Sequence, residues 1–184
     1  IRFWPIRSPD FASAITIESW IKVNSLPGNF PMIVDKNPTN SSYLLFANGL
    51  AGAGSGTVPF TMRVNTSGLD DATSKTTIQY GQWYHVVGTY DSQDVKIYVN
   101  GRLEGTTPAS GSIATSAGVL SFGSADPPTS NYLDGSIDEI RLYNVARSST
   151  QILADYQSDQ LAAHNRGQAY NVLYSTNAGS TWNF

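Results

Sequence analysis

Asp138 lies in the segment GSIDEIRLYN (135–144), where apolar and polar residues alternate as in a half-buried strand. Strict alternation places Asp138 on the same face as Ile140 and Leu142, and that face is expected to meet the core. A carboxylate buried there needs either a bound cation or several backbone N–H donors, because an uncompensated buried charge is costly. The sequence therefore predicts one of two things at Asp138: a cation site, or a turn capped by the carboxylate.

A second group of candidate residues combines an aromatic ring with polar side chains in loops. Tyr132 stands in the proline-containing loop SADPPTSNYLDG (124–135), and aromatic rings stack on the C–H faces of sugars while polar groups bind the hydroxyls. The predicted ligand-binding residues are Tyr132, Asn131, Asp126 and Asp134, with Asn40 and Tyr43 as a neighbouring wall. The alternative is an ordinary solvated loop.

Trp20 is the third candidate, because alternation in AITIESWIKV (14–23) puts it opposite Ile15 and Ile17. If that face is open, Trp20 would converge with Tyr98, Glu139 and Arg141; if the strand twists strongly, Trp20 packs in the core. His85 has no acidic partner close in sequence, so we expect a hydrogen-bonded histidine within a sheet rather than a catalyst.

Short segments rich in β-branched and aromatic residues must position these side chains. The clearest is YHVVGTYDSQDVKIYVNG (84–101), which predicts two antiparallel strands around a polar turn, with Asn100-Gly101 suited to a type I′ turn. Further strands are expected over 14–23, 31–36, 42–47, 60–64, 75–79, 119–123 and 135–143. A short helix is expected over 149–157, with Ser148 or Ser149 as its N-cap. The prediction is an all-β, antiparallel two-sheet sandwich with one short helix.

Three blocks in order carry a family resemblance: SPDFASAITIESWIK (8–22), GQWYHVVGTYDSQDVKIYVNG (81–101) and YLDGSIDEIRLYNVARSSTQI (132–152). They resemble the laminin-G-like domains of the concanavalin A-like lectin/glucanase jelly rolls. The resemblance implies a jelly-roll fold, a binding role toward carbohydrate or another surface, and a structural Ca²⁺ against Asp138, with Asp10 as a second ligand. It covers about residues 8–157, so we expect a jelly-roll domain over 1–160. Residues 161–184 form an extension whose STNAGSTW (175–182) resembles an Asp-box hairpin.

Composition excludes several classes of function. With 184 residues, a net charge of −3 and a pI near 5.2, the chain lacks the basic surface of a nucleic-acid binder. No apolar run is long enough to insert in a membrane. The chain has no cysteine, which excludes disulfides and thiolate zinc sites and favours a bacterial, archaeal or phage origin.

The sequence does not predict an enzyme, because the E-x-D-x-x-E strand of the glucanases of this fold is absent and Asp138 and Glu139 are adjacent. We expect a non-catalytic carbohydrate-binding or adhesion module of a larger extracellular or surface protein. The alternative is a structural or assembly domain, in a surface layer or a virion, that acts through neighbouring protein domains or subunits.

Overall fold

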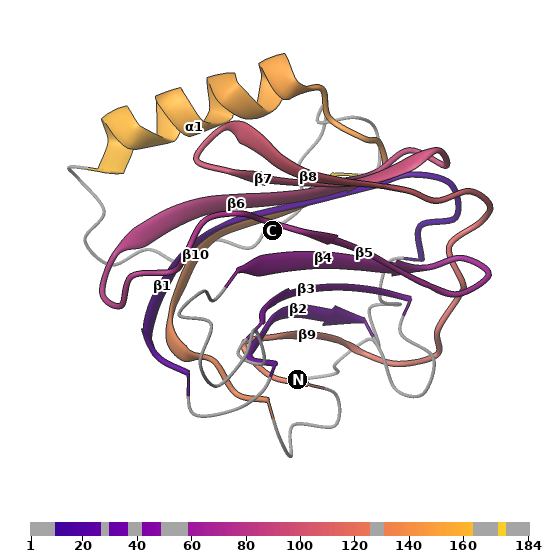
Figure 1. Ribbon diagram of the computed structural model, residues 1–184, viewed down its shortest axis with the longest axis horizontal. Coiled ribbons are helices and arrows are strands. Elements are labelled where there is room, and N and C mark those ends of the chain that lie inside the picture. The colour runs from indigo at the N-terminus through magenta and orange to yellow at the C-terminus, as the bar shows by residue number, and fades with distance from the viewer. Residues whose placement is uncertain are drawn as a thin grey trace, which may run out of the picture.

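The computed structural model describes residues 10–26, 30–36, 42–48, 59–125, 131–163 and 173–175, which form two stacked β-sheets and one helix (Figure 1). One sheet has the order β11-β10-β1-β6-β7-β8 and the other the order β5-β4-β3-β2-β9. All pairs are antiparallel except β10–β11. The predicted all-β jelly-roll sandwich is therefore confirmed.

Buried side chains from both sheets meet in the core between them, and β1, β3, β4, β6 and β7 contribute most of these side chains. The six-stranded sheet contains β11 (Leu173–Ser175), β10 (Asp134–Tyr143), β1 (Ile15–Ser25), β6 (Trp83–Tyr90), β7 (Asp94–Val99) and β8 (Arg102–Pro108). The five-stranded sheet contains β5 (Leu69–Thr73), β4 (Phe60–Asn65), β3 (Tyr43–Ala47), β2 (Met32–Lys36) and β9 (Leu120–Phe122).

Alternation along β1 shows how the core is built. Ile15, Ile17 and Ile21 are fully buried between the two sheets, as the sequence predicts. Trp20 and Lys22 project from the opposite face of β1, away from the five-stranded sheet. Each buried aliphatic side chain stabilises the fold by about 1.5–3 kcal/mol through removal from water.

The turns before and after β7 are those that the sequence predicts. Asp91 accepts hydrogen bonds from the backbone N–H groups of Gln93 and Asp94 at 3.0 and 2.8 Å, which fixes the first turn. Asn100 and Gly101 have φ angles of 51° and 77°, so the predicted type I′ turn is confirmed. A Cβ on Gly101 would lie 2.9 Å from Leu153 Cδ1, so the glycine also leaves room for the helix.

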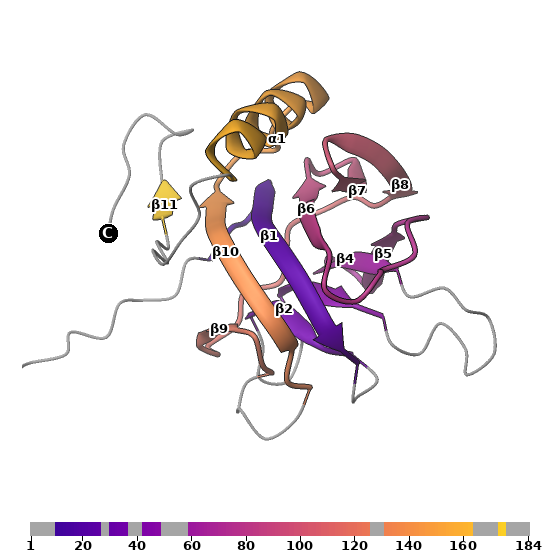
Figure 2. The same ribbon diagram turned by 90° about the vertical axis from the view of Figure 1, so that its left-hand side faces the viewer.

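The helix α1 (Ser149–Ala163) lies on the outer face of the six-stranded sheet (Figures 1 and 2). Ser148 is its N-cap: the Ser148 Oγ accepts from Gln151 N at 3.3 Å, and Ser148 N donates to the Gln151 side chain at 2.9 Å. This reciprocal pair confirms the predicted start of the helix. The helix extends six residues past the predicted end at Gln157, to Ala163. It is too short to cross a membrane, and no other helix occurs in the described ranges.

One strand predicted near the edge of the five-stranded sheet is wrong, and the predicted division of the chain into two segments is not tested. Residues 75–79, predicted as a strand, are not one; the strand at this edge is β5, which lies in the segment predicted as a loop. An ion pair across the β4–β5 ladder, between Arg63 and Asp71 at 2.6 Å, supports β5. Part of the C-terminal extension, β11, pairs with β10, whereas the Asp-box-like turn after Ser175 lies outside the described residues. The division into 1–160 and 161–184 stays a prediction.

Candidate functional site

The outer face of the six-stranded sheet has a covered end and an open end. Figure 2 shows α1 over the end where β1 begins and β10 finishes, leaving the opposite ends of these strands without a helix above them. Trp20 and His85 lie beside the helix, whereas Lys22, Trp83 and Ser136 lie further along the same face. These two regions have different chemistry.

A bulge in β10 decides where Asp138 points. Glu18 pairs with Arg141, yet two residues later Trp20 pairs with Asp138, so β10 has one extra residue at this place. Glu139 absorbs it with a φ of 52°. Asp138 therefore shares the outer face with Trp20, and the prediction that it faces the core with Ile140 is wrong. Its Oδ1 accepts from Glu139 N at 2.9 Å, which is the turn-capping alternative.

Asp10 lies elsewhere in the fold. Its carboxylate is 3.6 Å from the Nζ of Lys36 on β2, in the five-stranded sheet. The ammonium of Lys36 also donates to the carbonyls of Ser116 and Gly118 at 2.8 and 2.6 Å. Asp10 thus contacts the five-stranded sheet, whereas Asp138 lies on the outer face of the six-stranded sheet, and the structure shows no contact between the two carboxylates.

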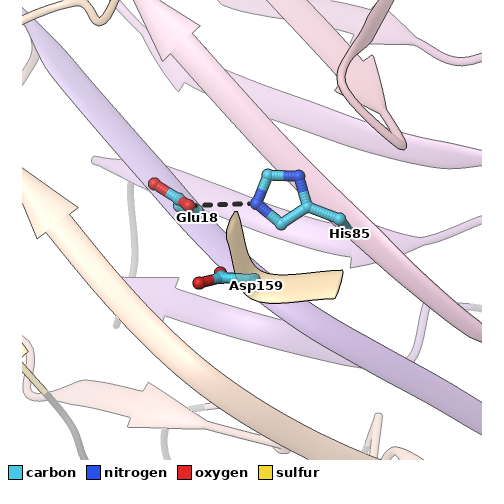
Figure 3. Close-up of side chains that lie close together, drawn as sticks. All are labelled: Glu18, His85 and Asp159. Carbon is cyan, nitrogen blue, oxygen red and sulfur yellow. Dashed lines mark hydrogen bonds and ion pairs between the residues drawn. The ribbon is translucent and has the colours of Figure 1, made fainter. Parts of the chain in front are cut away.

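A polar cluster lies beneath α1: Glu18, His85 and Asp159 lie close together (Figure 3), and Arg141 contacts both carboxylates. The Nε2 of His85 on β6 is 3.0 Å from the Oε1 of Glu18 on β1, and both side chains are fully buried. The Nη1 of Arg141 donates to Glu18 at 3.1 Å and to Asp159 of α1 at 2.9 Å, while its Nη2 donates to Glu139 at 2.6 Å. The guanidinium thus links two sheet strands to the helix.

The electrostatics of this cluster follow from burial and from Arg141. Burial opposes the charged guanidinium, but the hydrogen bond that Arg141 donates to Asp159 and the charges of the surrounding carboxylates raise the pKa of Arg141. Burial likewise opposes the charged form of Asp159, but the hydrogen bond and charge of Arg141 hold the pKa of Asp159 below its usual value. The charged pair is therefore the stable form in the folded protein.

The cluster is not arranged for metal binding or catalysis. Ligand atoms of Glu18, His85 and Asp159 lie within 4.8 Å of one another, but Arg141 already donates to both carboxylates. The ring of Trp20 stacks on Tyr156 of α1 at 5.8 Å and lies 5.3 Å from the ring of His85. These aromatic rings and the helix close the cluster to a substrate. The expectation that His85 is a hydrogen-bonded sheet residue is confirmed, although its partner Glu18 is 67 residues away.

Trp20 and Arg141 lie together on the outer face, as predicted, but α1 covers this part of the face, so it is not open to a ligand. Trp20 and Arg141 both bond to Asp159, and Tyr98 packs with Val87 and Ile152. Trp20 is thus buried, yet outside the core between the sheets. The spacing of Ile152, Tyr156 and Asp159 is the signal for this arrangement, because residues three or four apart share a helix face.

The open end of the sheet carries the exposed aromatic rings. Among the described residues the exposed aromatic side chains are Tyr80, Trp83 and Tyr132, at 60, 37 and 53% exposure. Tyr80 lies in the turn before β6, which Gly81 N ties to Val23 O of β1 at 2.7 Å. Trp83 begins β6 opposite Lys22, and Tyr132 precedes the start of β10 by two residues. All three therefore belong to one end of the sandwich.

Polar groups accompany these rings. Asp134 accepts hydrogen bonds from the side chains of Asn24 and Ser25 at 3.4 and 2.5 Å, which fixes the start of β10 against the end of β1. Gln79 and Gln82 are exposed on either side of Tyr80. Sequence reasoning identified Tyr132 and Asp134 but missed Tyr80 and Trp83, whose place beside them depends on strand order.

The other predicted loop residues are placed as follows. Asn131 has a φ of 55° and its carbonyl accepts from Met32 N at 3.0 Å, so it holds the loop to β2. Tyr43 is fully buried and packs on Phe11 at 5.7 Å; it is a core residue, so the prediction that it lines a binding loop is wrong. Asn40 and Asp126 lie outside the described residues.

A family model for the concanavalin A-like lectin/glucanase superfamily, Laminin_G_3, matches residues 5–153. The chain belongs to this superfamily. The resemblance predicted from the three sequence blocks is therefore confirmed, and the match spans both sheets and the start of α1. No curated protein sequence matches the chain.

Several solved structures share the fold of this chain at low sequence identity. A candidate carbohydrate-binding protein from Bacteroides ovatus is 20% identical with a TM-score of 0.62, over 82% of this chain and 42% of that one. Domain 4 of AbnA, an extracellular GH43 arabinanase from Geobacillus stearothermophilus solved with arabinotriose, is 20% identical with a TM-score of 0.61, over 79% and 69%. A heptameric SAP-like pentraxin from Limulus polyphemus is 17% identical with a TM-score of 0.57, over 84% and 78%. The chain spans less than half of the B. ovatus protein.

Proposed function

We propose that this chain is a non-catalytic carbohydrate-binding module of a larger extracellular or surface protein, and that it binds sugar at the open end of the six-stranded sheet. The observation that carries the proposal is the gathering of Tyr80, Trp83 and Tyr132, the exposed aromatic side chains of the described residues, at this one end. Large aromatic rings are costly to leave in water and are suited to stacking against pyranose or furanose rings.

The polar surroundings support a sugar rather than an apolar ligand. Exposed Gln79, Gln82 and Asn24 offer both donors and acceptors for hydroxyl groups. A surface of exposed rings on the strand ends suits an extended polysaccharide, which needs no deep cavity. Two solved structures with this fold are described as carbohydrate-binding or contain an arabinotriose ligand, which supports the same class of partner.

The burial of His85 together with Glu18 supports a binding module over an enzyme, because neither side chain is exposed to a ligand. The closest combination of carboxylates and histidine, around Glu18, is sealed beneath α1. The extracellular context is part of the proposal; it is supported by the domain of the extracellular arabinanase.

Calcium is a separate element of the proposal. Asp138 is half-buried on the outer face, one strand away from Trp20, and its carboxylate has oxygen atoms of the kind calcium prefers. Asp10 cannot contribute to the same site, so the ligand set would have to come from elsewhere. Calorimetry with CaCl₂ on the native protein and on Asp138→Asn tests this: heat of binding lost in the variant supports the site, and identical heats reject it.

Binding to a panel of soluble and insoluble polysaccharides, including arabinan, tests the proposed sugar surface. We expect Trp83→Ala and Tyr80→Ala each to weaken binding about tenfold, equivalent to about 1.4 kcal/mol, with the melting temperature unchanged. Leu69→Ala and Leu103→Ala are controls, because both remove exposed apolar side chains elsewhere on the sandwich. Binding that survives Trp83→Ala and Tyr80→Ala would reject this surface. Self-association without any glycan binding would favour the assembly-domain alternative.

A further inference from the structure

Lys22 gives the open end of the sheet a positive charge beside the aromatic ring of Trp83. Its Nζ lies 5.4 Å from the centre of the Trp83 ring, across the β1–β6 pair. Because the two residues are direct cross-strand neighbours, the ammonium and the indole are held side by side. Any sugar that contacts Trp83 therefore has its substituents within reach of a positive charge.

This charge has no carboxylate partner in the described part of the chain. The ion pairs there join Lys36, Arg63, Lys96, Arg141 and Arg147 to acidic groups, and Lys22 is in none of them. A lysine stacked on an exposed tryptophan and left without a counter-charge is available to an anionic ligand.

The carboxylates of Asp134 and Asp138 accept hydrogen bonds within the protein, and neither forms an ion pair with Lys22. Asp134 accepts from Asn24 and Ser25, which directs both of its oxygens to the end of β1. Asp138 is half-buried and caps Glu139 N. The residue of β10 that pairs with Lys22 is Ser136, which is uncharged. An anionic group above Trp83 would thus meet the ammonium of Lys22 first.

The geometry points to a polysaccharide with anionic sugar residues as the ligand, with the sugar ring on Trp83 and its carboxylate or sulfate on Lys22. This inference rests on the proposed function and narrows its ligand class. Since the whole chain carries a net charge of −3, attraction to an acidic polymer must come from a local site rather than from the overall field.

Paired ligands that differ only in charge test the inference. Polygalacturonate is compared with its carboxyl-reduced form, and dextran sulfate with dextran, by calorimetry and affinity electrophoresis on the complete chain. We expect at least one acidic polymer to bind about fivefold more tightly than its neutral counterpart, and the difference to shrink as salt is raised from about 20 to 300 mM. The pair that shows the preference identifies the group as carboxylate or sulfate.

Protein variants separate a local contact from a general charge effect. Lys22→Met keeps the length and apolar stem of the side chain and should remove the preference for the acidic polymer, whereas Lys22→Arg should retain it. Lys75→Met is the matched control, because Lys75 is exposed and in no ion pair of the described residues but lies beside Glu104 of β8. Equal binding of charged and neutral polymers, or a preference that survives Lys22→Met, overturns the inference while leaving the sugar surface intact. Binding of no polymer at all rejects the proposed function itself.

Discussion

Replacing Arg141 by methionine removes the charge that holds α1 on the sheet. The variant loses the contacts of the guanidinium to Glu18, Glu139 and Asp159 at 3.1, 2.6 and 2.9 Å, so the positive charge that these three carboxylates share is removed. Glu139 is about a third exposed and can turn to water, but Glu18 is fully buried and cannot. Breaking one partner of a buried ion pair typically costs about 3–5 kcal/mol, so we expect the free energy of unfolding to fall by about 3 kcal/mol at pH 7.

The loss should depend on pH in a defined direction. In the native protein Arg141 outweighs burial and lowers the pKa of Asp159, so this stabilisation is fully present above the ordinary value of about 4 and is lost as pH falls through the lowered pKa. Arg141→Met lacks this contribution at every pH, and protonation of the neighbouring carboxyl groups relieves the repulsion between them in acid. The difference between native and variant should therefore shrink between about pH 7 and pH 3.

Urea unfolding followed by tryptophan fluorescence measures both effects, since Trp20 lies in the same cluster. Arg63→Met is the matched control, because its bidentate pair with Asp71 is partly exposed and should cost about 1 kcal/mol with little dependence on pH. Glu18→Gln in the Arg141→Met background should restore part of the loss. A deficit for Arg141→Met equal to that of Arg63→Met and constant with pH would refute the reasoning.

Three further changes test the packing that positions the site. Gly105→Ala should lower the free energy of unfolding by about 2 kcal/mol or more in thermal unfolding, because its Cβ would lie 2.3 Å from the Thr73 carbonyl oxygen, which is backbone. Gly88→Ala should cost less, because its Cβ would meet the Met62 side chain at 2.5 Å, and that side chain can move. A larger loss for Gly88→Ala than for Gly105→Ala would contradict this account. Ser148→Ala removes the N-cap of α1 and should cost about 1 kcal/mol in urea unfolding, with no loss of polysaccharide binding at the open end. Lys36→Met removes the ammonium that donates to the buried carbonyl of Gly118 and the partly buried carbonyl of Ser116, and should cost about 2 kcal/mol in the same assay, whereas Lys75→Met should be neutral.

Local patterns in the sequence were sufficient for the strands and for the turns that depend on single residues. Alternation in β1 predicts that Ile15 and Ile17 face the core, because successive side chains of a strand point to opposite faces. Asn100-Gly101 predicts its own turn because glycine and asparagine tolerate positive φ. The N-cap of α1 is equally local. These features need only neighbours within a few residues.

The sequence by itself determined a jelly roll of the concanavalin A-like superfamily, the start of its helix, and Tyr132 and Asp134 as candidate binding residues. Only the tertiary structure decided which surface is open. A one-residue bulge at Glu139 reversed the face of Asp138, since a strand with period two inverts every side chain beyond an extra residue. The same packing buries Glu18 and His85 beneath α1 and places Lys22 beside Trp83. Contacts between residues 60 or more positions apart depend on strand order, which no local pattern encodes.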